Sequence, residues 1–325
     1  MARILVTGAS GFIGSHIARA LAADGHRVRA SGRNRAALAT LGPGIDTHAA
    51  DLASDDLQPL LAGVDAAVHS AARSSPWGTP AQFQRDNVLA TERLLAASVQ
   101  AGVGRFVHFG SPSIYFRFAD QYAVGEAFEP PPRWITPYAR SKWESELRVR
   151  AHAAHLPSVV LRPRAVFGPG DTAIFPRLLA VAASGRFPLV HGGRAVIDIT
   201  HVDNVVAATR AALADSAPGD GRAYNISNGE PTAVGELLAQ TFALCGLQVR
   251  LRPVPRQLAL AAAGIAETLA RLRPGQPEPR LTRYGVGVIG WSQTLDIGCA
   301  RDELGYQPQV TLEQGLADFA RSWRQ

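Results

Sequence analysis

Short apolar stretches alternate with longer segments of helical periodicity along the first half of the chain. The helical segments, 15–24 (SHIARALAAD) and 91–102 (TERLLAASVQAG), carry apolar residues three and four positions apart, which is the spacing of one helix face. The strand-like runs, bounded by glycine and polar residues, are 2–8, 26–32, 65–71, 105–111 and 158–164. This alternation predicts right-handed βαβ units, and therefore an α/β fold with a doubly wound parallel sheet.

The first strand is followed by a glycine-rich turn that opens the first helix. Residues 7–14 read TGASGFIG, and Gly8, Gly11 and Gly14 are spaced for a tight turn, for close approach of a pyrophosphate and for packing of helix on strand. The helix start would then offer its amide groups to the phosphates. The same turn without a ligand is the alternative, but the flanking strand and helix favour a Rossmann-type dinucleotide site.

The end of the second strand distinguishes between the two nicotinamide dinucleotides. An NAD site usually offers a carboxylate to the ribose hydroxyls, whereas an arginine accommodates the 2′-phosphate of NADP. Gly32 stands where the carboxylate would be, and Arg33 and Arg35 follow it, so we expect NADP(H) rather than NAD. Two solvated arginines at a helix start are the alternative. Asp51, after the third strand, either bonds the adenine amine or caps the next helix.

The alternation of strands and helices weakens after about residue 168. We therefore expect residues 1–168 to form the dinucleotide-binding domain, with 195–228 returning to it. A smaller, mixed C-terminal lobe that binds the substrate is expected to contain 169–194 and 229–325. Proline-rich stretches within the chain predict loops rather than domain linkers.

Composition narrows the classes of partner and the cellular setting. The 325 residues are 46% hydrophobic and 18% charged, with a net charge of +6. The arginines are scattered rather than clustered, so we expect anionic small ligands and no nucleic acid. Cys245 and Cys299 lie far apart without metal-type spacing, and neither a leader nor a membrane-spanning run is visible. These features predict a cytoplasmic protein with free thiols and no metal.

Lys142 is the only lysine among the 33 lysines and arginines of the chain. It belongs to YARSK, residues 138–142, so Tyr138 lies four positions earlier and on the same face of a helix. Ammonium is a compact point charge, whereas guanidinium is a planar fork. The contrast predicts a site that needs the compact head group, and a surface lysine retained by chance is the alternative.

Several segments together resemble a known family. The first set is TGASGFIG, VHSAAR, Asn87 within RDNVLAT, GSPSIY, YARSK and LRPRAVFGPGD. These motifs resemble those of the extended short-chain dehydrogenase/reductase superfamily over essentially the whole chain. The later segments ITHVDNVVAATRAAL, GRAYNISNGEP and LGYQPQVTLEQGL are similar to its 3β-hydroxysteroid-dehydrogenase-like branch.

The resemblance implies a Ser-Tyr-Lys mechanism, in which hydride passes between the substrate carbon and the nicotinamide. Tyr138 would be the acid/base, Lys142 and the positively charged nicotinamide would lower the pKa of its phenol, and Lys142 would also bond the nicotinamide ribose. A phenol with a pKa near 10 needs roughly 4 kcal/mol of preferential stabilisation to ionise near pH 7. Ser111 would orient the carbonyl oxygen as charge develops, with Ser113 as the competitor. Without the family, either serine is a turn residue.

The resemblance also implies which residues contact the cofactor. Asn87 would hold Lys142 through a water as well as pack its own helix. The expected set is Gly8, Ser10, Gly11, Phe12, Ile13, Gly14, Arg33, Asp51, Leu52, Ser70, Ala71, Ala72, Asn87, Tyr138, Lys142, Pro163, Ala165 and Val166. His69 and His108 are interpreted as buried structural histidines, and Asp203 as the N-cap of the helix that follows it.

Two classes of enzyme share this family scaffold, and the segment after residue 160 separates them. Nucleotide-sugar epimerases and dehydratases usually carry LR-aromatic-FN there and keep NAD tightly bound. This chain has Pro163, Arg164 and Ala165 in place of the aromatic pair and the asparagine, which favours a reductase with exchangeable NADPH. The motifs resemble those of bacterial 2-alkyl-3-oxoalkanoate reductases. The alternatives are a nucleotide-sugar epimerase and a non-catalytic NADP-binding regulatory protein, although the latter usually loses the tyrosine or the lysine.

Residues 257–272, QLALAAAGIAETLARL, are largely apolar at helical spacing. Such a helix packs into the core, forms a lid over an apolar pocket or rests on a membrane surface, and Glu267 excludes a membrane span. Tyr284 and Trp291 add aromatic surface to this region, and the net positive charge suits a substrate carboxylate. We therefore expect an NADP(H)-dependent oxidoreductase that interconverts a hydroxyl and a ketone on a hydrophobic 3-keto acid or sterol-like substrate, and that forms a homodimer.

Overall fold

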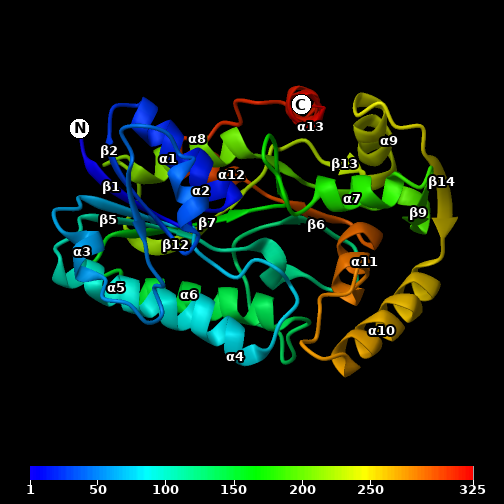
Figure 1. The fold of residues 1–325 in the computed structure, drawn as a ribbon, viewed down its shortest axis with the longest axis horizontal. Helices are drawn as coiled ribbons and strands as arrows, with labels where there is room; N and C mark the ends of the chain where they lie inside the picture. Colours follow the sequence, from blue (N-terminus) through cyan, green and yellow to red (C-terminus); the bar gives the residue numbers. More distant parts are fainter. Residues whose placement is uncertain (325) are drawn as a thin grey trace.

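The computed structural model describes residues 1–324 and is organised around a parallel sheet of seven strands (Figure 1). In their order across the sheet, the strands are β12 (Asp220–Ile226), β7 (Ser158–Pro163), β5 (Arg105–Phe109), β4 (Ala66–His69), β1 (Arg3–Thr7), β2 (Arg27–Gly32) and β3 (Asp46–Ala49). All neighbouring strands run parallel. The order places β2 and β3 on one side of β1 and the later strands on the other, as in doubly wound folds. The predicted fold class is confirmed.

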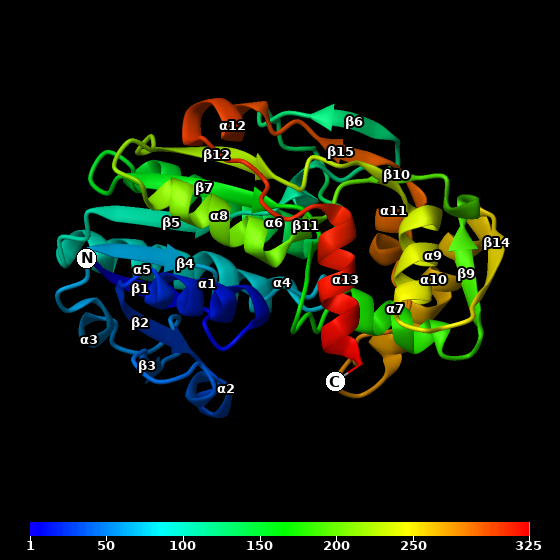
Figure 2. The ribbon, with the colours of Figure 1, turned by 90° about the horizontal axis from the view of Figure 1, so that it is seen from above.

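Helices cover both faces of this sheet, which explains why its strands are almost continuously apolar. Figures 1 and 2 show α1 (Phe12–Ala23) and α8 (Val202–Leu213) on one face of the sheet. On the other face lie α5 (Ala90–Gln100) and α6 (Pro137–His152). The sheet is therefore the middle layer of three, and its strand ends are held rigidly.

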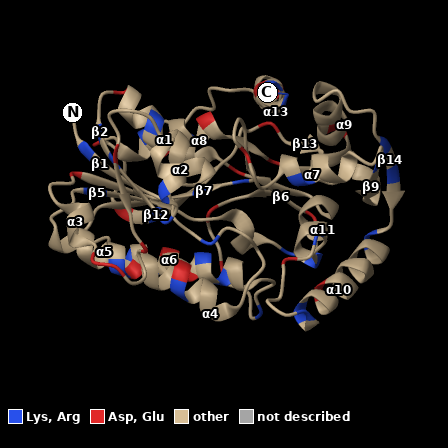
Figure 3. Ribbon diagram, in the orientation of Figure 1, with Lys and Arg blue, Asp and Glu red and all other residues tan. Residues whose placement is uncertain are grey.

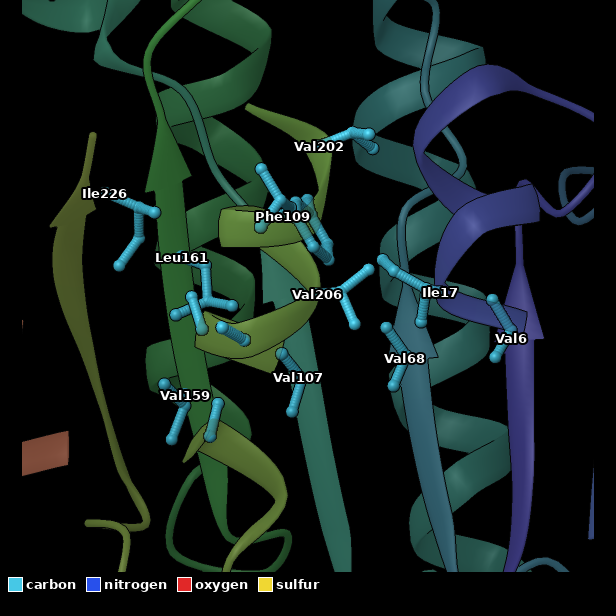
Figure 4. Close-up of a cluster of buried hydrophobic side chains, with 14 of the residues drawn as sticks. Val6, Ile17, Val68, Val107, Phe109, Val159, Leu161, Val202, Val206 and Ile226 are labelled. Atoms are coloured by element: carbon cyan, nitrogen blue, oxygen red, sulfur yellow. The ribbon is translucent and has the colours of Figure 1, made fainter. Parts of the chain in front are cut away.

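Successive residues of each strand send side chains to opposite faces of the sheet. Val6 and Val68 pack with Ile17 of α1 and Val206 of α8 (Figure 4), and none of the four is more than 4% exposed. Leu5, the neighbour of Val6, joins a second cluster against α5 and α6. Two apolar cores thus hold the sheet from both sides.

Shorter helices connect the strands, and another group follows residue 168. The connecting segments are α2 (Arg35–Ala39), α3 (Gln58–Leu61), α4 (Pro80–Phe83), the π-helix η1 (Gln84–Leu89) and the 3₁₀-helix η2 (Pro112–Tyr115). The later segments are α7 (Phe175–Ala182), η3 (His191–Gly193), α9 (Val234–Leu244), α10 (Arg256–Leu272), α11 (Arg283–Gly290), α12 (Gly298–Leu304) and α13 (Leu312–Trp323).

Small sheets join segments that lie far apart in the sequence. A four-stranded sheet has the order β13 (Thr232–Ala233), β10 (Val196–Ile197), β15 (Gln293–Leu295) and β6 (Gln121–Val124). Two further pairs are β11 (Thr200–His201) with β8 (Val166–Phe167), and β14 (Arg250–Val254) with β9 (Arg186–Val190). The pairing of β6 with β15 ties the first half of the chain to its C-terminal part. The domain boundaries stay a prediction.

Helix α10 does not bury its most apolar face, so a core role for the whole helix is wrong. Its buried residues are Ala259, Ala263, Glu267 and Ala270, and this small-residue face packs against α11. Glu267 is satisfied there, because it accepts hydrogen bonds from the amide and the Nε atom of Arg283 at 2.7 and 3.0 Å. The outer face of α10 consists of Leu258, Ile265, Leu269 and Leu272, each more than half exposed. A bilayer-spanning helix is absent from residues 1–324, since none has the required length and hydropathy.

Candidate active site

The glycine-rich turn lies between β1 and α1, at the edge of the sheet where the strand order reverses. Gly8 has a φ of 73°, and a side chain there would approach the amide nitrogen of Ala71 to 2.6 Å. A Cβ atom on Gly14 would lie 2.4 Å from the Gly8 carbonyl oxygen. In the described chain, no side chain caps the start of α1 at Gly11. A ligand can therefore reach the first amides of α1, where the helix dipole favours a pyrophosphate.

A cleft of about 790 Å³ runs from this turn across the ends of β1, β4, β5 and β7. The three predicted catalytic residues, Ser111, Tyr138 and Lys142, all line it. The other expected cofactor contacts that line it are Gly8, Ser10, Gly11, Phe12, Ile13, Gly14, Arg33, Asp51, Leu52, Ser70, Ala71, Ala72, Pro163, Ala165 and Val166. Asn87 does not line the cleft. The sheet thus brings most of the expected residues together, although their contacts with a cofactor stay a prediction.

The end of β2 forms the part of the cleft expected to distinguish NADP from NAD. A Cβ atom on Gly32 would lie 2.4 Å from the Oγ atom of Ser10, so the missing carboxylate has a packing reason as well. The Arg33 side chain is 59% exposed, and its Nη1 atom lies 3.7 Å from the Asp86 carboxylate. The buried Ser31 hydroxyl has no hydrogen-bond partner in the described part of the chain. These groups fit a polar, anionic ligand.

Asp51 follows β3, and its carboxylate accepts two hydrogen bonds within the described chain. Its Oδ1 atom accepts from the Ala53 amide at 3.0 Å within a turn. The capping interpretation is wrong, because the next helix, α3, begins after Leu57 and has no side-chain cap among the described residues. The Oδ2 atom of Asp51 accepts from Arg85 at 2.6 Å. The Arg85 guanidinium lowers the pKa of the Asp51 carboxyl. The ionised carboxylate at the cleft wall can still accept from an amine of a bound ligand.

Tyr138 and Lys142 lie on the first turns of α6. The helix begins after Thr136, whose hydroxyl accepts a hydrogen bond from the Ala139 amide at 3.0 Å. Pro137 occupies the first helical turn, where its fixed φ suits a helix start. The predicted sharing of one helix face is confirmed, because both side chains line the cleft.

The amino group of Lys142 lies inside the protein, with 3% of the residue exposed. Its Nζ atom donates a hydrogen bond to the carbonyl oxygen of Phe109, the last residue of β5. Burial lowers the pKa of Lys142 to about 8, while Glu146 acts in the opposite direction. The only lysine of the chain is therefore a buried cleft residue rather than a surface residue.

Without a bound nicotinamide, the surroundings of Tyr138 raise the pKa of its phenol, and the lowering expected from Lys142 together with the cofactor stays a prediction. Burial raises the pKa of Tyr138; the Ser111 hydroxyl opposes the rise and the Glu146 carboxylate adds to it. The Lys142 amino group donates to the Phe109 carbonyl, so its charge is partly engaged elsewhere. Tyr138 consequently keeps its proton at neutral pH, and a protonated phenol can donate to a ketone oxygen.

Ser111 lies in the loop between β5 and η2. Its Oγ atom caps η2 by accepting a hydrogen bond from the Ser113 amide at 3.2 Å. The same hydroxyl influences the pKa of Tyr138, so the capping and the substrate-orienting interpretations are compatible. Ser113 lines the cleft as well, and its buried hydroxyl has no partner among the described residues. Ser111 is the serine that acts on the phenol.

Asn87 lies within the π-helix η1, a type of helix that often marks functional sites. Its Oδ1 atom accepts from the Arg73 amide at 2.7 Å, and its Nδ2 atom donates to the Arg73 carbonyl at 3.3 Å and to the Ser141 hydroxyl at 2.9 Å. Ser141 precedes Lys142 on α6. The predicted packing role is confirmed, and a water-mediated link from Asn87 to Lys142 stays a prediction.

The histidines next to the cleft are structural, as predicted. His69 and His108 are each 1% exposed, and their rings bond threonine or serine hydroxyls. The N-cap prediction for Asp203 is wrong, because His201 caps α8 by accepting the Asp203 amide on its Nδ1 atom at 3.3 Å. Asp203 lies in the first turn of the helix, where the dipole favours a carboxylate.

Arg164 and Tyr284 line the cleft, although neither belongs to the expected set of catalytic and cofactor residues. The departure from the sugar-enzyme motif was the sequence signal for Arg164. Trp291 does not line the cleft; the Arg256 guanidinium lies 4.7 Å from its ring centre. Helix α10 contributes no lining residue, whereas α11 contributes Tyr284 and Val288. Residues 257–272 thus line no part of this cleft, and a lid over a bound substrate stays a prediction.

A glycine-rich turn that faces a tyrosine–lysine pair across one cleft is typical of the short-chain dehydrogenase/reductase class. Within residues 1–324, no group of His, Cys, Asp and Glu side chains is arranged to hold a metal. The model of the family described as "NAD dependent epimerase/dehydratase family" matches residues 4–227. The chain belongs to this family.

Relatives and a solved structure agree with this placement. The 2-alkyl-3-oxoalkanoate reductase of Stenotrophomonas maltophilia (strain K279a) is 37% identical over 329 residues, which is 97% of each chain. The 4-hydroxy-2-methyl-3-oxo-4-farnesyl-3,4-dihydroquinoline-1-oxide ketoreductase of Stigmatella aurantiaca is 34% identical over 97% of this chain and 94% of the relative. MoeE5 in complex with UDP-glucuronic acid and NAD has a TM-score of 0.79 and 29% identity, with 99% of both chains covered. Reductase relatives of full length place the chain among the oxidoreductases of the family.

Proposed function

We propose that the protein is an NADP(H)-dependent ketoreductase that acts on a hydrophobic 3-keto acid. One observation carries the proposal: the protonated phenol of Tyr138 shares a cleft with the glycine-rich turn, Arg33 and the apolar side chains of Ile174 and Val288. The names of the Stenotrophomonas and Stigmatella relatives, a reductase and a ketoreductase, support the same chemistry.

Reduction of a ketone needs a hydride at carbon and a proton at oxygen. NADPH supplies the hydride when it is bound. Tyr138 gives its phenolic proton to the carbonyl oxygen, and Ser111 donates a hydrogen bond to the same oxygen as negative charge develops. The Lys142 ammonium, with a pKa of about 8, stabilises the phenolate that remains on Tyr138.

The cofactor preference depends on the end of β2 rather than on the fold. MoeE5, with the same fold, is in complex with NAD, so the fold by itself does not favour NADP. Gly32 offers no carboxylate to the ribose hydroxyls, and the exposed Arg33 can pair with a 2′-phosphate. We infer from this pair of residues that NADPH is preferred.

Incubating the purified protein with NADPH and 3-keto acids of increasing chain length tests the proposal. Because each buried methylene contributes roughly 0.8 kcal/mol, kcat/KM should rise about fourfold per methylene while the chain stays in the cleft. UDP-glucuronic acid and UDP-glucose with NAD form the second arm. Turnover of a UDP-sugar without any ketone reduction would assign the protein to the nucleotide-sugar epimerases. NADPH binding without turnover of any substrate would favour a non-catalytic role, which the shared cleft position of Tyr138 and Lys142 argues against.

We also propose that the outer face of α10 rests on an anionic membrane surface, where a hydrophobic substrate would accumulate. Arg271 and Arg273 are exposed at the end of this helix, and Figure 3 shows basic segments there. An apolar stripe with basic residues beside it is the pattern of interfacial helices. Helix α11, which packs on α10, carries cleft residues.

We propose further that the protein is a homodimer in the cytoplasm. Light scattering measures the mass of the particle in solution and so distinguishes a dimer from a monomer.

A further inference from the structure

Arg164 is a buried charge whose partner the chain does not supply. The residue is 5% exposed and lines the cleft. In the described part of the chain, its Nε and Nη2 atoms have no hydrogen-bond partner. A guanidinium removed from water without an ion pair is unfavourable by several kcal/mol. The cleft therefore contains a place where an anion would be stabilised.

The backbone holds Arg164 firmly at the end of β7. Its amide donates to the Ile226 carbonyl of β12 at 3.0 Å, and its carbonyl accepts from the Thr200 hydroxyl at 2.6 Å. The Thr200 amide also donates to the carbonyl of Ala165 at 3.3 Å. Anchoring on two neighbouring segments fixes the position from which the Arg164 side chain extends, as a specific ligand contact requires.

The carboxylate that acts on Arg164 electrostatically is Asp198, but its oxygens are engaged elsewhere. They accept hydrogen bonds from the Leu295 amide at 2.7 Å and from the Ser227 hydroxyl at 3.2 Å. Neither Nε nor Nη2 of Arg164 is bonded to it. Asp198 lowers the electrostatic cost of the buried guanidinium without occupying its hydrogen-bonding edge.

Tyr284 adds a donor to the same part of the cleft. Burial raises the pKa of Tyr284 to about 12, with Arg164 acting against the rise and Tyr138 adding to it. The phenol of Tyr284 is therefore protonated, and Tyr284, Arg164 and Tyr138 all line the same cleft. Arg164 and Tyr284 thus provide an anion site next to the proton donor Tyr138.

We propose that Arg164, together with Tyr284, binds the carboxylate of the substrate beside the ketone that Tyr138 reduces. This assignment rests on the proposed function, which has a hydrophobic 3-keto acid as substrate, and names the residues that bind the carboxylate of that acid. In a 3-keto acid a single carbon separates the carboxylate from the ketone, so neighbouring groups can hold both. A guanidinium can bind a carboxylate through two parallel hydrogen bonds, whereas an ester offers it no charge.

The test is made in the oxidation direction, because 3-hydroxy acids are stable whereas 3-keto acids lose carbon dioxide. In this direction Tyr138 first releases its phenolic proton to solvent, and the phenolate then takes the hydroxyl proton while NADP⁺, when bound, would accept the hydride. The assay is therefore run at alkaline pH, and NADPH absorbance reports turnover. kcat/KM is measured for 3-hydroxydodecanoic acid and its methyl ester with the wild type, Arg164→Met, Arg164→Lys and Arg140→Met. Arg140 is the matched control, because its side chain is 64% exposed and pairs with Glu144 on the surface of α6. NADPH affinity is measured on each variant by fluorescence.

Arg164→Met should lower kcat/KM for the acid by about thirtyfold or more, and for the ester by less than about threefold. Arg164→Lys should retain an intermediate preference for the acid, and Arg140→Met should change neither substrate. The melting temperature of Arg164→Met should not fall, since the variant removes a buried unpaired charge. Equal losses on acid and ester would overturn the assignment. A loss of NADPH affinity that matches the loss of turnover would also overturn it, by placing the guanidinium against the cofactor.

A further arm separates this inference from the proposed function. If the wild type oxidises neither alcohol but turns over UDP-glucuronic acid, the ketoreductase proposal fails. The carboxylate contact would then be supported by a selective loss of UDP-glucuronic acid turnover over UDP-glucose turnover in Arg164→Met. Equal losses on the two sugars would reject the contact.

Discussion

The side chain of Lys142 is buried, and its compact ammonium group donates a hydrogen bond to one carbonyl oxygen, that of Phe109. A guanidinium would need room for a planar fork and would place its charge differently relative to Tyr138. Lys142→Arg should therefore fold and bind NADPH, but lose turnover severely. Tyr138→Phe removes the proton donor and should cost about a hundredfold to ten-thousandfold in kcat. Steady-state kinetics, with melting curves and NADPH titrations as controls, measure both effects. Wild-type activity of Lys142→Arg at all pH values would contradict the role of the ammonium.

The buried ammonium of Lys142 also makes the stability of the protein depend on pH. Its pKa is about 8 in the fold and 10.5 ordinarily, so between these values the unfolded chain binds a proton that the folded chain has released. The free energy of unfolding contributed by this group therefore rises with pH across that window. Below pH 8 the buried charge costs roughly 3 kcal/mol, from about 1.4 kcal/mol per factor of ten in the ionisation constant.

Lys142→Met removes this titration. At pH 7 its free energy of unfolding should exceed that of the wild type by the largest amount. This excess in stability should shrink as the pH rises from 8 to 10. Urea denaturation at each pH measures the difference in the free energy of unfolding between the variant and the wild type. The contributions of the other ionisable groups largely cancel in this difference, because both proteins contain them. A difference that stays constant from pH 7 to 10 would show that Lys142 keeps its ordinary pKa in the fold.

Arg33 is the residue on which the NADPH preference depends. A charge-assisted contact with the 2′-phosphate is worth roughly 1.5 to 3 kcal/mol. Arg33→Ala should thus weaken NADPH binding about tenfold or more and leave NADH binding nearly unchanged, as measured by fluorescence titration. The neighbouring Arg35→Ala is the matched control. Equal affinity of the wild type for NADPH and NADH would refute the assignment.

At the scale of secondary-structure elements, α10 shows where apolar periodicity misleads. The pattern of residues 257–272 predicts a helix and the structure has one, but the leucines and the isoleucine face outwards. The reason lies in its neighbour, because Ala259 and Ala263 of α10 pack in one buried cluster with Val286 of α11. Glu267 lies on the inner face because Arg283 satisfies it. Hydropathy alone could not show that small residues would form the contact.

The outer face of α10 leads to a prediction about membranes. The double variant Ile265→Ser, Leu269→Ser removes two large side chains that are 63% and 52% exposed, so the fold should be retained. Sedimentation with vesicles that contain phosphatidylserine should show weaker binding of the variant than of the wild type, and high salt should weaken both. Equal sedimentation of the two proteins would exclude this face as the membrane contact. Turnover of a short, soluble substrate serves as the activity control.

For the whole molecule, the sequence predicts the main sheet well because its strands are buried runs separated by amphipathic helices. The later part is less predictable, since strands of two or three residues such as β10 and β15 pair across distant segments. The same contrast between local pattern and distant pairing holds for single residues of the site. Tyr138, Lys142 and the glycines belong to local motifs, whereas Arg164 joins the cleft through pairing with Ile226 and Thr200. The motif around Arg164 marked a departure from the sugar enzymes, but its local sequence did not show that the side chain would lie unpaired in the cleft.

The close approach of Gly32 to Ser10 has a consequence for how the chain could change its cofactor. An acidic residue at position 32 is the substitution that would favour NAD, but its Cβ atom would meet the Oγ and Cβ atoms of Ser10 at 2.4 and 2.9 Å. The carboxylate therefore fits only if the Ser10 side chain moves away or is shortened, and neither change brings a gain in NAD binding by itself. The two positions form an epistatic pair. A mutational route from NADP to NAD, in evolution or in the laboratory, is thus eased by a first change at position 10 that selection for NAD alone would not enrich.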